Sequence, residues 1–156
     1  MKLILSTLVV LFLALGIVKS QNADSIRIAT YMENAKVELK QNNYEKSREF
    51  CIQALAIDSL FGEAYMLIGY AYINSADSCE LLDPFTRKMI LCLAVDMFEK
   101  AKQVDASQKE KAEQLIETSS KWFLTEKDIF TRFNEGDTIH IGCWINEKTT
   151  VRYNKH

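Results

Sequence analysis

The chain has 156 residues and a formal net charge of −2, with 26% charged and 48% hydrophobic side chains. This length suits one domain with its own core, and the small acidic excess excludes the basic surface that proteins use to hold nucleic acid. One proline and five glycines favour helices and argue against a disordered linker.

Residues 1–20 have the pattern of a secretory signal peptide. Lys2 supplies a positive charge, residues 3–18 are mostly apolar, and small side chains such as Ser20 precede the expected cleavage site. An uncleaved membrane anchor is the alternative, but this apolar run is shorter than the roughly twenty residues that span a bilayer. We therefore expect an exported protein, periplasmic or secreted, with no stable membrane anchor after cleavage.

A first pair of helices is predicted on either side of Asn42-Asn43. Asp24 can cap a helix whose apolar residues have helical spacing, and Tyr44 to Ile57 resumes that spacing after the two asparagines. In the second of these helices the inward residues are predicted to be Tyr44, Ser47, Cys51, Ala54 and Leu55, and the outward residues Glu45, Lys46, Arg48, Glu49 and Gln53.

A second pair is predicted from two spaced patterns, Tyr65-x-x-Ile68-Gly69-x-x-Tyr72 and Ala94-x-x-x-Phe98-x-x-Ala101. The first pattern lies in a helix from Gly62 to Asn74. The second lies in a helix from about Pro84 to Val104, which begins at an Asp83 N-cap. Because Gly69 has no side chain, two helix backbones can approach closely there, and we expect the two segments to be antiparallel neighbours.

These patterns resemble the signature of the tetratricopeptide repeat (TPR), W-x-x-L-G-x-x-Y followed by A-x-x-x-F. The resemblance covers Ile28 to Ala106 and implies an α-solenoid of two helix hairpins, the second interrupted by about thirteen inserted residues at about 75–89. Beyond it, the chain from Trp122 to Arg152 is similar to the tail of small exported TPR proteins of gram-negative bacteria, with Cys143 where glycine is expected and Leu124 where proline is expected. The resemblance implies an envelope location and an interaction scaffold, without an established activity.

The rest of the chain is predicted to close this scaffold. Ser107 to Glu110 reads as a capping box that opens a helix to about Lys121, so that residues 21–121 form the helical domain. Residues 122–156 then read as a β-hairpin tail that packs on the helices. Its first strand is predicted to direct Ile139, Ile141, Cys143 and Ile145 to one face, and residues 149–153 to return as the second strand after a turn at 146–148. The fold class is therefore mainly α with a small C-terminal β-hairpin.

Four cysteines follow the signal peptide, and an exported chain meets an oxidising compartment. Cys79 and Cys92 bracket the insertion and are the preferred disulfide pair. Cys51 in a helix core and Cys143 in an apolar strand face are interpreted as small buried hydrophobic residues.

The residues give little support to catalysis, a cofactor or a metal site. His140 and Cys143 have an odd separation along the predicted strand, which would send their side chains to opposite faces. No phosphate loop, nucleophile elbow or Cys-x-x-Cys pair occurs, and the acidic residues are spread over outer helix faces. We therefore expect a protein that is not an enzyme.

A repeat scaffold offers a concave surface for an extended peptide with an acidic or carboxylate end. The residues predicted to line this surface are Met32, Lys36, Lys40, Glu63, Met66, Tyr70 and Asn74. The alternative is that Met66 and Tyr70 pack on the tail and the lysines are solvated. A second possible site is the free edge of the hairpin with Trp144, Arg152 and Tyr153, for which the alternative is a lid that completes the core.

The predicted function is non-catalytic interaction or assembly with a protein or peptide partner in the bacterial envelope. A structural subunit that associates with copies of itself, as a homo-oligomer, is one alternative, and a small-molecule carrier is another. The two alternatives can be distinguished by experiment: self-association depends on protein concentration, whereas a carrier needs a closed apolar pocket with converging polar groups.

Overall fold

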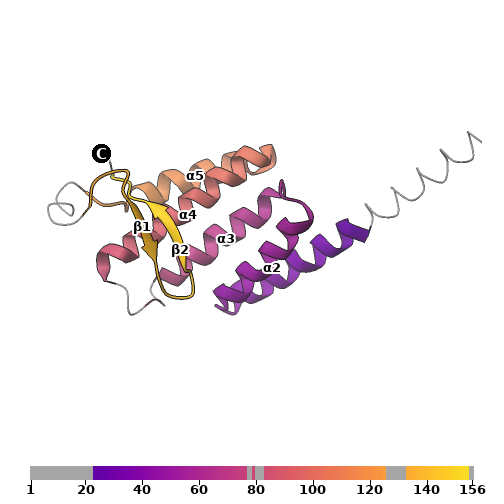
Figure 1. Ribbon diagram of the computed structural model, residues 1–156. Coiled ribbons are helices and arrows are strands. Elements are labelled where there is room, and N and C mark those ends of the chain that lie inside the picture. Colours follow the sequence, from indigo (N-terminus) through magenta and orange to yellow (C-terminus); the bar gives the residue numbers. More distant parts are fainter. Residues whose placement is uncertain (1–22, 77–78, 80–82, 126–132, 155–156) are drawn as a thin grey trace, which may run out of the picture.

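The computed structural model describes residues 23–76, 79, 83–125 and 133–154. In these ranges the protein is mainly helical, with a small two-stranded antiparallel sheet at one end of the helices (Figure 1). The expected signal peptide, residues 1–20, lies outside the described residues. Among the helices that are described, none combines the length and the apolar character that a membrane span requires.

The helices follow one another along the chain and pack on their sequence neighbours, α2 on α3, α3 on α4 and α4 on α5 (Figure 1). Those of the described ranges are a helix over 23–40, α2 (Tyr44–Ile57), α3 (Gly62–Ser75), α4 (Pro84–Val104), the short 3₁₀ helix η2 (Ala106–Gln108) and α5 (Lys109–Ser120). The bounds predicted for α2 and α4 are confirmed, and α3 ends one residue later than predicted.

Local signals explain where the helices begin. At the start of α4 the Asp83 side chain accepts hydrogen bonds from the backbone N–H of Phe85 at 3.0 Å and of Thr86 at 3.2 Å, with Pro84 at the first helical position. The capping box predicted at Ser107 is wrong. Asp105 caps this segment instead, because its carboxylate accepts from the Ser107 N–H at 2.9 Å and a turn of 3₁₀ helix precedes α5.

The core is centred on the contact between α3 and α4, which run in opposite directions (Figure 1). Gly69 lies directly against the Phe98 ring, so that a Cβ at this position would collide with three of the ring carbons. Phe98 is fully buried, and Tyr70 packs edge-on against it with the ring centroids 5.8 Å apart. The predicted close approach at Gly69 is confirmed, because the space left by the glycine holds the phenylalanine ring.

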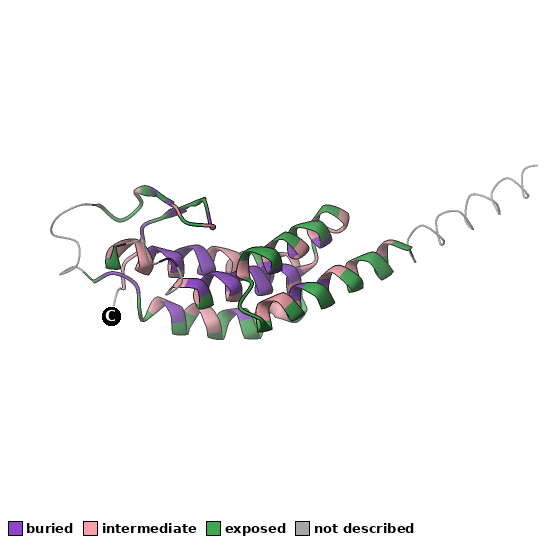
Figure 2. Cartoon of the chain, turned by 90° about the horizontal axis from the view of Figure 1, so that it is seen from below, coloured by how far each residue is buried: buried purple, intermediate pink, exposed green. Residues whose placement is uncertain are grey.

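The sheet joins β1 (Thr138–Ile141) to β2 (Glu147–Thr150) in an antiparallel register, with Thr138 opposite Thr150 and Ile141 opposite Glu147. It packs on α4, and Ile139, Ile141, Ile145 and Val151 belong to the same core as the helices. Figure 2 shows that buried residues face the interior of this assembly, while the helix next to the grey N-terminal trace is largely exposed.

The predicted extent of the strands is wrong at the turn. Cys143 and Ile145 do not belong to β1, because the chain leaves the strand after Ile141 and turns over residues 142–146. Cys143 and Asn146 have φ values of 63° and 48°, in the left-handed region, and the Asn146 N–H bonds to the Gly142 carbonyl at 3.3 Å. A residue with left-handed backbone cannot continue a strand, so β1 ends at Ile141 although the alternation of apolar residues continues to Ile145.

Candidate functional site

Two of the residues predicted to line the concave surface lie in the core. Met32 and Met66 are only 3% and 2% exposed, and both belong to the buried hydrophobic cluster. Their placement on a partner-binding surface is therefore wrong. The helical spacing that places them on one face is the same spacing that directs them between packed helices, which explains the error.

The charged residues of the predicted surface are at least partly exposed. Lys36 on the first helix pairs with Glu63 at the start of α3, with Nζ and Oε1 2.8 Å apart. This hydrogen bond raises the pKa of Lys36 above its ordinary value. Lys40 and Asn74 are exposed. The structure thus brings Lys36 and Glu63 together as a link between the two helices, and leaves Lys40 and Asn74 available to a partner.

Tyr70 is half-buried between α4 and α5. One edge of its ring faces Phe98, and the Lys111 ammonium of α5 lies over the ring, 5.5 Å from the centroid. This cation–π contact orders a lysine beside an aromatic surface that is still partly accessible. Tyr70 and Lys111 therefore offer a partner both an apolar face and a positive charge. Lys111 is absent from the prediction because it lies in the helix that was interpreted only as a cap.

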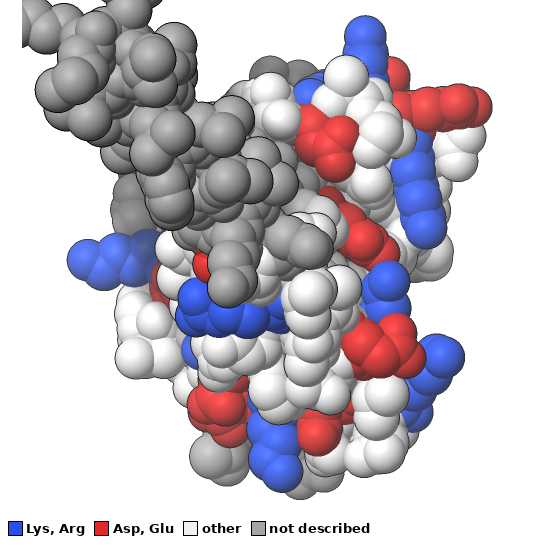
Figure 3. All heavy atoms as spheres, turned by 90° about the vertical axis from the view of Figure 1, so that its right-hand side faces the viewer, with Lys and Arg blue, Asp and Glu red and all other residues white. Residues whose placement is uncertain are grey.

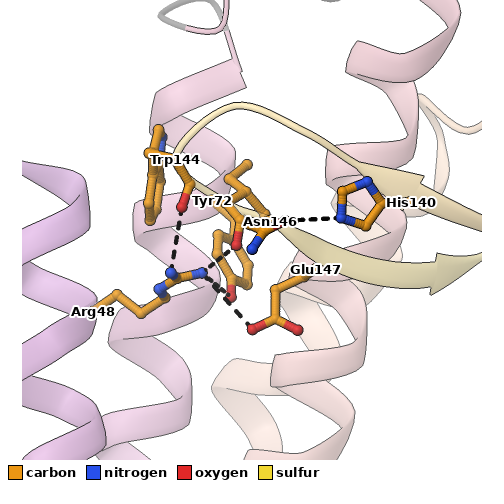
Figure 4. Close-up of polar contacts among 7 residues, drawn as sticks. Arg48, Tyr72, His140, Trp144, Asn146 and Glu147 are labelled. Carbon is orange, nitrogen blue, oxygen red and sulfur yellow. Dashed lines mark hydrogen bonds and ion pairs between the residues drawn. The ribbon is translucent and has the colours of Figure 1, made fainter.

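The most connected polar cluster joins α2, α3 and the turn between the strands, and its centre is Arg48 (Figure 4). The Arg48 guanidinium donates to the carbonyls of Ile145 at 2.6 Å and Trp144 at 3.3 Å. It also lies over the Trp144 ring at 5.0 Å and approaches the Tyr72 hydroxyl at 3.4 Å. We call Arg48, Tyr72, Trp144 and Ile145 the Arg48 clamp, because together they fix the tail to the helices.

The clamp overturns the sequence interpretation of Arg48 as an outward, solvated side chain. Its side chain is 15% exposed, and Glu147 lies 3.8 Å from it as an ion-pair partner. Burial also raises the pKa of Tyr72 above its ordinary value, with a hydrogen bond from Arg48 acting in the opposite direction. Two buried donors of the clamp, Arg48 Nε and Trp144 Nε1, have no acceptor within the described part of the chain.

A second set of polar contacts ties the end of the tail to α4. Arg152 pairs with Asp96 and donates to the Cys92 carbonyl at 3.2 Å, while the Thr149 hydroxyl donates to the other Asp96 oxygen at 2.9 Å. The Tyr153 hydroxyl donates to the Phe133 carbonyl at 2.8 Å. Trp144, Arg152 and Tyr153, proposed from sequence as interface residues, therefore all contact the chain itself. This supports the lid interpretation of the tail.

The preferred disulfide pair is wrong. Cys79 is bonded to Cys143, and Cys92 is a free thiol on the buried face of α4. The physical reason is that Cys92 faces the helix core, whereas Cys143 projects from the turn of the tail next to the segment that carries Cys79. Burial raises the pKa of Cys92 to about 11 and that of Cys51 to about 12, so that neither free thiol has the thiolate character of a nucleophile.

His140 and Cys143, considered from the sequence as metal ligands, each contact another residue of the chain. His140 Nε2 lies 2.9 Å from Asn146 Oδ1, and Cys143 is consumed by the disulfide. In the ranges that the structure describes, no group of three histidine, cysteine or acidic side chains converges as a metal site would require. The described residues form a helical body, a tail that a disulfide and hydrogen bonds attach to it, and a few partly exposed aromatic and charged side chains.

In comparisons with known proteins, no family model, no curated protein and no solved structure matches the chain.

Proposed function

We propose that the protein is a non-catalytic interaction module, built from two TPR-type helix hairpins, that binds a peptide or protein segment in the bacterial envelope. The observation that carries this proposal is the packing of Gly69 against Phe98. This contact joins the two halves of the repeat signature, because the first half has a glycine where the second half has a large aromatic ring.

The arrangement of the helices supports a repeat scaffold. From α2 to α5 each helix packs on the next along the chain, as repeat hairpins do, and α5 covers α4 with its own Ala112 and Ser119 buried. Two hairpins are fewer than the three or so repeats that usually make a stable stack. The tail supplies further buried surface, since Ile141, Ile145 and Val151 are fully buried against the helices.

The proposed partner surface consists of Lys40, Tyr70 and Asn74 from the predicted concave face, together with Lys111, which lies over the Tyr70 ring. Two lysines and an aromatic ring suit a peptide that carries a carboxylate next to an apolar side chain. On the face drawn in Figure 3, Lys and Arg lie among Asp and Glu, so that the visible part of this face carries no field of one sign to steer a partner.

The experiment is site-specific crosslinking in cells that export the protein. A photo-reactive amino acid at Asn74 is expected to capture a defined partner, and Lys40→Glu is expected to reduce this product several-fold because it reverses a charge on the proposed surface. Lys148→Glu makes the same exchange at an exposed position of β2 and serves as the matched control. Equal products from the wild type and Lys40→Glu, or equal losses in both variants, would contradict the proposal.

A structural subunit that associates with itself is the second candidate, because aliphatic side chains remain uncovered on the first hairpin. Ile26 is 60% exposed and Ile52 is 50% exposed. Burial of such residues between two copies would favour association. Light scattering over a hundredfold range of concentration tests it: a strict monomer excludes this candidate, and a dimer that Ile52→Glu dissociates favours it.

A further inference from the structure

A hollow of about 310 Å³ lies between the tail and the turn that joins the first helix to α2. Trp144 contributes one part of its lining, and the remaining lining residues are Asn42, Asn43, Tyr44, Glu45 and Lys46. Its two sides come from segments about a hundred positions apart in the chain, and the Arg48 clamp sets their separation. The hollow therefore depends on the folded arrangement of tail and helices.

The indole of Trp144 is held in place from within the protein. Arg48 lies over it at 5.0 Å, Tyr72 is 5.8 Å away between ring centroids, and Arg48 also binds the Trp144 carbonyl at 3.3 Å (Figure 4). Trp144 nevertheless remains partly exposed. A partly exposed ring with a fixed position is a ready surface for the apolar face of a ligand, since little conformational freedom is lost on binding.

The opposite side of the hollow is polar and ordered. The Tyr44 hydroxyl donates to Asn42 Oδ1 at 2.9 Å, and Asn43 Nδ2 donates to Glu38 Oε2 at 2.8 Å. These bonds fix both amides and leave Asn42 Nδ2 and Asn43 Oδ1 without a partner among the described side chains. The lining that faces Trp144 thus includes an amide donor and an amide acceptor that the described residues do not use.

The charges of the residues that line the hollow indicate which class of ligand it can hold. Glu45 and Lys46 carry opposite signs, and the Glu38 carboxylate lies behind Asn43. The hollow therefore has no positive excess with which to hold a phosphate, a sulfate or a uronic acid. The polar amides equally disfavour a purely apolar ligand, which would leave them unpaired.

We propose that this hollow binds one end of a neutral oligosaccharide. A sugar ring has a face of C–H groups that stacks on an indole and a rim of hydroxyls that both donate and accept hydrogen bonds. This combination matches Trp144 on one side and the amides of Asn42 and Asn43 on the other.

The test uses the fluorescence of Trp144. The chain has two tryptophans, and Trp122, 70% exposed, is removed by Trp122→Phe to leave Trp144 as the reporter. Cellobiose and N,N′-diacetylchitobiose are the neutral probes. We expect a saturable change in emission with at least one of them, and binding about fivefold weaker in Asn42→Gly, the size expected for one lost hydrogen bond.

Asn42→Gly is chosen because Asn42 has a φ of 63°, which glycine adopts without strain. Asn146→Gly makes the same change at another left-handed position, outside the hollow, and is expected to leave the affinity unchanged. Thermal melting confirms that each variant is folded. The proposal is overturned if neither sugar gives a saturable response, if both glycine variants lose affinity equally, or if an anionic disaccharide or an unrelated peptide binds as tightly as the neutral probes.

Discussion

The disulfide between Cys79 and Cys143 should make a large contribution to the free energy of unfolding. The bond joins residues with a sequence separation of 64 and links the tail to the segment between α3 and α4. In the chain-entropy model, closing a loop of this size in the unfolded chain corresponds to about 4 kcal/mol at 25 °C. Reduction of the bond, or Cys143→Ser, is expected to remove about that much stability.

The backbone of Cys143 makes a sharper test possible. Its φ of 63° lies in the left-handed region, where a residue with a Cβ costs about 1 kcal/mol relative to glycine. Cys143→Gly removes the disulfide but also relieves this cost. We therefore expect Cys143→Gly to lose about 3 kcal/mol, and to be about 1 kcal/mol more stable than Cys143→Ser.

Urea unfolding followed by circular dichroism measures both differences. The oxidised wild type, the reduced wild type and the two variants are compared at pH 7, where the buried thiols of Cys51 and Cys92 remain protonated because their pKa values are about 12 and about 11. A loss below about 1 kcal/mol on reduction would refute the argument from loop closure. Equal stability of Cys143→Gly and Cys143→Ser would refute the argument from the backbone.

Three further perturbations test the packing, the clamp and the buried thiols. Gly69→Ala should cost about 1–3 kcal/mol in urea unfolding because its methyl group meets the Phe98 ring, and Phe98→Leu should recover part of that loss in the double variant. Arg48→Ala should cost about 3 kcal/mol and speed hydrogen exchange in β2, and Arg48→Lys should rescue little, because lysine cannot bind two carbonyls while stacking on an indole. Burial raises the pKa of Cys51 to about 12, so its contribution to the free energy of unfolding is complete below about pH 9 and is lost as the pH rises toward 12. The free energy of unfolding should therefore fall between pH 8 and pH 10 more in the wild type than in Cys51→Ala, by about 1.4 kcal/mol per pH unit above 9.

The helices are largely predictable because their signals are local. Asn42-Asn43 ends one helix, and Asp83-Pro84 begins another through a side-chain cap that acts on its own next turn. The close contact at Gly69 is predictable for a related reason. A glycine within an apolar helical face usually indicates that another backbone or a ring packs closely against that position. Each of these inferences needs only a few residues on either side.

The tail shows where this reasoning stops. Ile139, Ile141, Cys143 and Ile145 alternate as in a strand, yet the strand ends at Ile141 and the chain turns. Ile145 is buried by its contacts with the helices, so its apolar character reflects packing and not strand periodicity. The sequence places the turn at 146–148, and the expectation of glycine at position 143 is a signal that could have moved it earlier, since glycine favours the left-handed backbone found there.

Arg48 could not be found from the sequence, because its two shortest hydrogen bonds go to backbone carbonyls of the tail. A carbonyl carries no sequence signal, and an arginine in the second turn of an amphipathic helix normally indicates a solvated face. The disulfide was missed for a similar reason. Spacing can show which cysteines flank an insertion, but it cannot show which of them face one another.

The proposed sugar site at Trp144 and the proposed partner surface at Lys40 and Asn74 can be tested separately, because only the first depends on the contacts that hold the tail. The hollow at Trp144 exists only while the Arg48 clamp holds, so changes to the clamp alter sugar binding and stability together. Lys40 and Asn74 are exposed and take no part in the contacts that hold the described residues of the tail, so Lys40→Glu should change partner capture while leaving the melting temperature as it is. A variant at Lys40 that lost both stability and partner binding would show that the helical surface and the tail are not independent, and the proposed partner surface would then have to be sought nearer the clamp.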